Sequence, residues 1–129
     1  MNEKMKSEFI ELYKMVLADG DVAPEEMEVL YRIGTKEYNV SLEEINVAIR
    51  DADTTFFIPE TLDGKVRLLY HLAEIAWADG KIEESEKTLL KRYTDLFGFI
   101  EENQDALVDY MLEQVKEKVD LQSIINQLK

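Results

Sequence analysis

Apolar residues recur at intervals of three and four along most of the chain, which is the spacing of one helix face. No segment alternates with period two for long enough to form a strand. The pattern predicts a compact all-α bundle of about six to seven helices. The first helix covers about residues 3–18, and its inward positions are Met5, Phe9, Leu12, Tyr13 and Val16.

Residues that favour helix ends mark the boundaries. Ser41 and Glu44 have the spacing of a capping box, in which each side chain bonds the other residue's backbone N–H. Asp120 can cap a short last helix. The helices after the first should run from Pro24 to near Asn39, from Ser41 to about residue 50, from the end of a connector at 53–61 to Gly80, from Glu83–Glu86 to Gly98, over about 102–117 and over about 120–128.

The chain partly repeats itself after sixty positions. Ala18-Asp19-Gly20 matches Ala78-Asp79-Gly80, and after Arg32 and Arg92 a slip of one residue keeps the match. The repeat predicts one domain, residues 1–129, in which units 8–50 and 68–112 superpose about a pseudo-twofold axis. Other matching positions are Leu12 and Leu72, Val22 and Ile82, Glu26 and Glu86, and Leu30 and Leu90, followed by Tyr38-Asn39-Val40 and Phe97-Gly98-Phe99.

His71 is the only histidine, and its counterpart in the repeat is Glu11. Glu11 is a polar residue next to the inward Leu12, so we expect His71 to lie on the surface. No serine or acidic partner is placed beside it in the manner of a catalytic triad, which makes it a poor candidate for a general base.

The chain carries 28 acidic and 15 basic residues, a formal charge of −13. This balance disfavours binding to nucleic acid and to anionic membrane surfaces. It favours basic proteins and divalent cations as partners. The absence of cysteine excludes thiolate zinc sites and thiol catalysis and fits a reducing compartment, so we expect a cytoplasmic location. No apolar run is long enough to insert into a membrane.

Asp19 and Asp79 fall at predicted helix C-termini, where the helix dipole disfavours an acid by about 0.3–1 kcal/mol. One interpretation is structural: each aspartate accepts backbone N–H bonds within its turn or caps the next helix. The other is a cation site shared with Glu26 or Glu86, which lie seven residues further on. Oxygen ligands alone would select calcium or magnesium. The spacing is not that of an EF-hand.

The two turns and their surroundings resemble the TerB family of tellurite-resistance and stress proteins over about residues 8–115. The resemblance rests on Leu17-Ala18-Asp19-Gly20-Asp21-Val22 with Glu26, and on Ile75-Ala76-Trp77-Ala78-Asp79-Gly80-Lys81-Ile82 with Glu86. It implies an all-helical, cytoplasmic, non-enzymatic protein, and relatives are appended to co-chaperones and membrane-linked stress systems. The candidate metal ligands that it implies here are Asp19, Asp21, Glu26, Asp79 and Glu86; Lys81 replaces the second acid of the first turn.

The sequence leaves two functions open. The first is an acidic stress-response adaptor of TerB type that binds a divalent cation through its turns. The second is a protein-interaction module whose acidic turns are only structural. An enzyme is not expected, because no cofactor motif or catalytic constellation is present. We expect Trp77 to pack in the core, and the run Phe56-Phe57-Ile58 either to tuck into the domain or to form an apolar patch for a partner.

Overall fold

A computed structural model describes residues 3–18, 23–50 and 58–128. This part of the chain forms seven α-helices and one short π-helical segment, without any β-strand, which confirms the all-α prediction. The predicted boundaries hold to within a few residues, as expected because helix ends are the least sharply defined part of the pattern. The elements are α1 (Glu3–Val16), α2 (Pro24–Arg32), η1 (Ile33–Glu37), α3 (Leu42–Arg50), α4 (Leu62–Ala76), α5 (Glu84–Leu96), α6 (Glu101–Lys116) and α7 (Leu121–Leu128).

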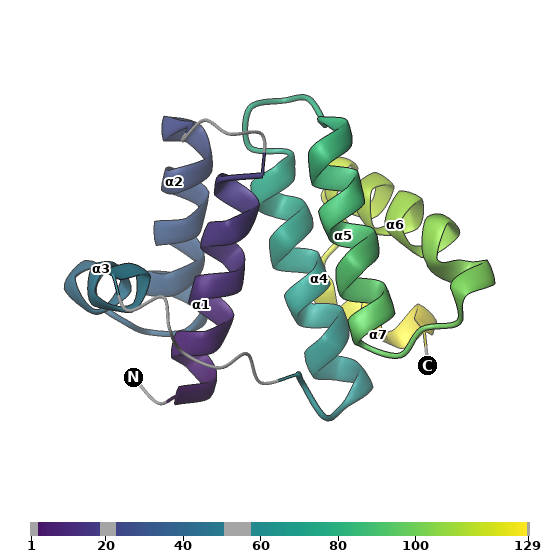
Figure 1. The fold of residues 1–129 in the computed structure, drawn as a ribbon, viewed down its shortest axis with the longest axis horizontal. Helices are drawn as coiled ribbons and strands as arrows, with labels where there is room; N and C mark the ends of the chain where they lie inside the picture. The colour runs from purple at the N-terminus through teal and green to yellow at the C-terminus, as the bar shows by residue number, and fades with distance from the viewer. Residues whose placement is uncertain (1–2, 19–22, 51–57, 129) are drawn as a thin grey trace.

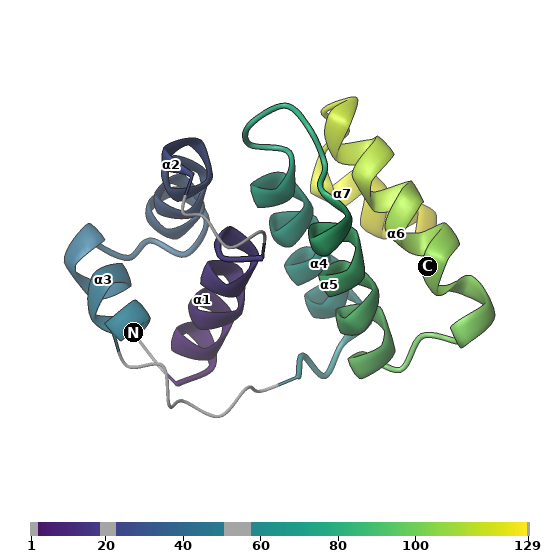
Figure 2. The ribbon, with the colours of Figure 1, turned by 45° about the horizontal axis from the view of Figure 1, so that its top comes forward.

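Helix α4 lies at the centre of the bundle. It contacts α1 and α2 on one side and α5, α6 and α7 on the other. Figure 1 shows α2, α1, α4 and α5 as a row of roughly aligned helices, with α3 at the left edge of the view. Helix α3 contacts α1. The turned view in Figure 2 shows α6 and α7 beyond α4 and α5, far from α3. The N-terminal half therefore reaches the C-terminal half mainly through α4.

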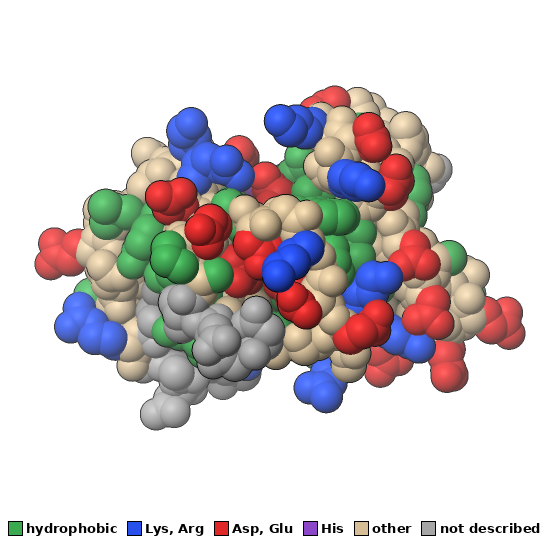
Figure 3. All heavy atoms as spheres, turned by 90° about the horizontal axis from the view of Figure 1, so that it is seen from above, with side chains coloured by type: hydrophobic (Ala, Val, Ile, Leu, Met, Phe, Trp, Pro, Cys, Tyr) green, Lys and Arg blue, Asp and Glu red, His purple; other side chains and the backbone are tan. Residues whose placement is uncertain are grey.

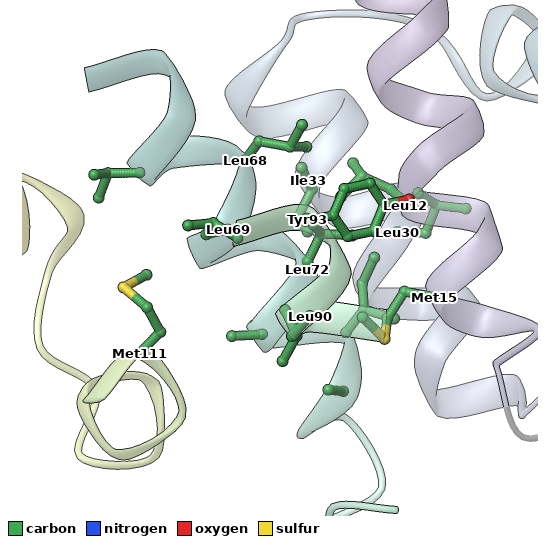
Figure 4. Packing of buried hydrophobic residues seen from close by; sticks show 14 of the residues in the cluster. Leu12, Met15, Leu30, Ile33, Leu68, Leu69, Leu72, Leu90, Tyr93 and Met111 are labelled. Carbon is green, nitrogen blue, oxygen red and sulfur yellow. The ribbon is translucent and has the colours of Figure 1, made fainter. Parts of the chain in front are cut away.

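The buried apolar side chains form one cluster to which every α-helix contributes. Leu12 of α1 and Leu72 of α4, which match in the repeat, are both fully buried. Figure 4 shows how the side chains of α1, α4 and α5 meet, with Tyr93 among Leu12, Leu30 and Leu72. At roughly 25 cal/mol per Å² of apolar surface removed from water, this shared cluster is the main force that holds the two halves together.

Side-chain caps occur where the sequence predicts them. Glu44 N–H donates to Ser41 Oγ at 3.1 Å, and Ser41 N–H donates to Glu44 Oε1 at 3.2 Å, which confirms the capping box. Asp120 Oδ2 accepts from Ser123 N–H at 3.2 Å and caps α7. Thr61 Oγ1 accepts from Gly64 N–H at 3.0 Å and caps α4, a cap that the pattern of apolar residues did not reveal.

The helix expected from Pro24 to about Asn39 is not uniform. After Arg32 its last turns widen into the π-helical segment Ile33–Glu37, and Asn39 ends it with a left-handed φ of 54°. Val40 N–H then donates to Gly34 O at 3.1 Å. The corresponding end of α5 has Gly98 at φ 87° and a 3.1 Å bond from Phe99 N–H to Thr94 O. Each half has its helices in the same order, and superposition of the halves about an axis stays a prediction.

The connector is described only from Ile58 onward. Ile58 is 44% exposed, so the expectation that this run tucks into the domain is wrong for Ile58. Phe56 and Phe57 lie outside the described residues. An isolated exposed isoleucine is common on protein surfaces and does not define a patch by itself.

Candidate functional site: the acidic turns and the buried polar residues

The structure describes the residues on either side of the first acidic turn, up to Ala18 and again from Ala23. Asp19 and Asp21 lie outside the described residues. Glu26, in the first turn of α2, is described, and it is only 1% exposed. Figure 1 places the end of α1 and the start of α2 at the same end of the molecule as the α4–α5 turn. A shared cation site at that end stays a prediction.

The second acidic turn is described completely. After α4 the backbone closes through Gly80 N–H, which donates to Trp77 O at 2.9 Å, and Gly80 takes a left-handed φ of 87°. Asp79 is exposed, and its Oδ1 accepts from Lys81 N–H at 3.2 Å. Such a bond from an aspartate to the backbone two residues on is an Asx turn. This geometry explains why an acid is tolerated at a helix C-terminus: it fixes the turn.

Glu86 has a different position and a different partner. It lies in the first turn of α5, is 3% exposed, and its Oε1 accepts from Glu83 N–H at 2.8 Å. This bond caps α5, as the third residue of a capping box does. The carboxylate also lies near the positive end of the helix dipole. Asp79 and Glu86 therefore each accept a hydrogen bond from a backbone N–H. This is what the structural interpretation of the acidic turn predicts.

The predicted ligands of the second turn do not assemble with other candidates. Within residues 3–18, 23–50 and 58–128, no three histidine, aspartate or glutamate side chains form a group that could hold a metal ion. The Asp79 carboxylate accepts a hydrogen bond within its own turn, whereas Glu86 is buried in the first turn of α5 and bonds the backbone there. Calcium usually takes six to eight oxygen ligands, so this turn by itself offers too few.

The expectation that His71 lies on the surface is wrong. His71 is only 2% exposed, and its Nδ1 lies 2.8 Å from Glu74 Oε1. Since an ionised carboxylate only accepts, Nδ1 donates in this pair. Arg32 Nη2 lies 3.5 Å from Glu74 Oε2, which links α2 to α4. The error has a physical cause: α4 is covered by helices on several sides, so a polar position next to an inward leucine is also buried.

Glu11, the counterpart of His71, is buried as well, at 5% exposure. Tyr93 O–H donates to Glu11 Oε1 at 2.6 Å, and Lys14 Nζ lies 3.0 Å from Glu11 Oε2. Burial is the main cause that raises the pKa of the Tyr93 hydroxyl, and the bond to Glu11 adds to it. This hydrogen bond joins α1 to α5 across the two halves. The sequence did contain one indication that these two polar residues have partners. Glu11 and His71 are each followed, three positions further on, by a charged residue with which they pair, Lys14 and Glu74.

A partly buried carboxyl group, that of Glu8, lies near His71. Burial raises the pKa of the Glu8 carboxyl, and Tyr38, His71 and Arg67 partly oppose this shift. Burial is also the main cause that raises the pKa of the Tyr38 hydroxyl. The rings of Tyr38 and His71 lie with their centroids 5.9 Å apart. These groups bring together α1, the end of the π-helical segment and α4.

No described helix is both long and apolar enough to cross a bilayer. Comparison of the chain with protein-family models, with curated proteins and with solved structures gives no match.

Proposed function

We propose that this chain is a non-enzymatic, TerB-like adaptor of the cytoplasm, a stress-response protein that works as a protein-interaction module. The observation that supports this proposal best is the geometry of the second acidic turn. Asp79 and Glu86 both accept backbone N–H bonds, so these acids have structural roles that need no metal. Two of the polar pairs near the contact between the halves are likewise internal: Tyr93 O–H donates to Glu11, and His71 Nδ1 lies 2.8 Å from Glu74 Oε1. The chemistry left for function is therefore the charged surface.

The partner that fits an excess of thirteen negative charges is a protein with a basic surface. Exposed charges are screened within about 8–10 Å at physiological ionic strength, so raising the salt concentration should weaken the association. We expect partners captured on the immobilised chain at low salt to be basic and to elute as salt rises. Partners that stay bound at high salt would contradict an electrostatic mode and favour an apolar one.

The second candidate function is a cation-dependent adaptor, which the retention of Asp19 and Asp79 in both turns favours. A cation that binds only the folded chain raises its melting temperature by mass action. The structural interpretation expects no response of the wild type to calcium or magnesium. A melting temperature that rises with calcium, and a response that is lost in the double variant Asp19→Asn, Asp79→Asn, would establish the cation site instead.

Matched substitutions test the structural roles without any metal. Asp79→Asn and Glu86→Gln keep an acceptor oxygen and remove the charge, whereas Asp79→Ala and Glu86→Ala remove both. If the backbone bonds matter, each alanine variant should lose about 1 kcal/mol of unfolding free energy, as lost caps do, and the amide variants should lose much less. Urea unfolding of the four variants gives the comparison. Equal losses in the amide and alanine variants would assign the effect to charge instead.

A further inference from the structure

A hollow at the end of the molecule that carries the α4–α5 turn is lined by apolar and charged side chains. Figure 3 looks onto this end and shows hydrophobic side chains in a depression with acidic and basic side chains around it. The hollow measures about 480 Å³. Its lining consists of Trp77, Ile82, Glu84, Lys87, Asp109, Leu112, Glu113 and Lys116.

Trp77 forms part of the floor of this hollow in a fixed orientation. The expectation of a plain core residue is only partly met, because Trp77 packs against the core but stays partly exposed. Its Nε1–H donates to Leu112 O at 2.8 Å. This bond satisfies the only polar group of the indole and holds α4 against α6. The ring therefore offers a preorganised aromatic face.

A cation already lies over that face. Lys116 Nζ is 5.8 Å from the centre of the Trp77 ring, within the range of a cation–π contact. Lys116 is exposed and lies in the last turn of α6, so its side chain can swing away at little cost. The chain's own ammonium group thus shows which chemistry this face accepts.

The charges around the floor favour a cation as well. Of the three carboxylates, Asp109 is 3.9 Å from Lys87 Nζ. Glu84 and Glu113 make no ion pair within the described part of the chain. Once Lys116 moves aside, three carboxylates and one lysine surround an aromatic and aliphatic floor. The floor suits the aliphatic stem of a long basic side chain, and the carboxylates suit its charged end.

We propose that this hollow docks an arginine or lysine side chain from a basic, partly apolar segment of a partner protein, which displaces Lys116 from Trp77. The proposal rests on the adaptor function proposed above and names the surface that performs it. Arginine fits best, because its planar guanidinium stacks on aromatic rings and is more weakly hydrated than an ammonium group.

The test uses the full chain and the fluorescence of Trp77, which is the only tryptophan. The probe is a short capped peptide that alternates arginine and leucine, and its control is the same peptide with citrulline, a neutral isostere, in place of arginine. The arginine peptide should change the emission of Trp77 in a saturable way, and the citrulline peptide should bind at least tenfold more weakly. Equal affinities of the two peptides would overturn the proposal, as would binding seen by calorimetry without any change in emission.

Lys116→Met separates docking at this hollow from general attraction to an acidic protein. The variant keeps an unbranched side chain of similar length and removes the competing charge, so peptide affinity should rise by about threefold or more. Lys36→Met makes the same change in charge on the π-helical segment and should raise affinity much less. Glu113→Gln should weaken binding by about two- to fivefold, and Glu43→Gln on α3 should not. Circular dichroism checks that each variant keeps its helices.

The outcomes distinguish this proposal from the adaptor function on which it rests. Salt-sensitive partners that bind the Lys116→Met and Lys36→Met variants equally, and leave Trp77 emission unchanged, would support the adaptor and overturn this docking surface. Partners that stay bound at high salt would contradict both the electrostatic adaptor function and this docking surface.

Discussion

Replacing Tyr93 with phenylalanine should lower the free energy of unfolding by about 2 kcal/mol, because it leaves a buried carboxylate without its buried donor. The 2.6 Å bond from Tyr93 O–H to Glu11 Oε1 has the length of a strong bond to an ionised acceptor. Lys14 can still pair with Glu11, but Lys14 is largely exposed, and exposed partners contribute little. Chemical denaturation monitored by circular dichroism measures the loss.

A double-mutant cycle shows whether the loss belongs to this pair. Glu11→Met alone should also destabilise the chain, because it leaves the Tyr93 hydroxyl buried without an acceptor. The double variant Glu11→Met, Tyr93→Phe should cost less than the sum of the two, since no polar group is then left unsatisfied. Tyr31→Phe is the matched control: its exposed bond to Asn46 should be worth about 0.5 kcal/mol or less. Additive losses would show that Glu11 and Tyr93 act independently.

Adding one methyl group at Gly34 should destabilise the chain by about 1–3 kcal/mol, although alanine is the better helix former. Gly34 is buried in the π-helical segment, and a Cβ there would collide with Ile45 Cδ1 and lie 3.0 Å from Phe9 Cε1. The missing side chain thus allows α3 and α1 to approach the segment closely. Thermal or urea unfolding of Gly34→Ala checks the direction.

The collision with Ile45 provides an internal control. Ile45→Val removes Cδ1 and should by itself cost about 0.5–1.5 kcal/mol as a lost core methyl group. In the Gly34→Ala background the same change should cost less, or restore stability, because it makes room for the new Cβ. If Gly34→Ala lowers the free energy of unfolding by the same amount with and without Ile45→Val, the strain lies in the backbone or in the contact with Phe9 and not in the contact with Ile45.

The helices and the caps of α3 and α7 could be predicted because the signals are local. Apolar spacing, the Ser41–Glu44 capping box and Asp120 involve residues within one or two turns of each other, and the same short-range bonds occur in the structure. A structural role for Asp79 could be proposed from the sequence because this signal is local as well: an Asx turn joins residues that are two positions apart. Sequence left the choice open because a cation site would use the same acid.

The buried polar residues could not be predicted in this way. Whether Glu11 and His71 face solvent depends on which helices cover α1 and α4, and this is decided by contacts between residues far apart in sequence. Tyr93 lies 82 positions from Glu11, so no local pattern joins them. The hollow beside Trp77 is of the same kind, because its lining comes from the turn between α4 and α5, from α5 and from α6.

The π-helical segment also accounts for the slip in the internal repeat. Matching residues are sixty positions apart up to Arg32 and Arg92 but fifty-nine apart at Tyr38 and Phe97, so the first half holds one extra residue between them. A π-turn takes up one residue more than an α-turn. Beyond it, Asn39 and Gly98 end their helices in the same left-handed conformation. A single extra residue that is absorbed in a π-turn in this way leaves the apolar face of the helix and the chain after it in the same phase.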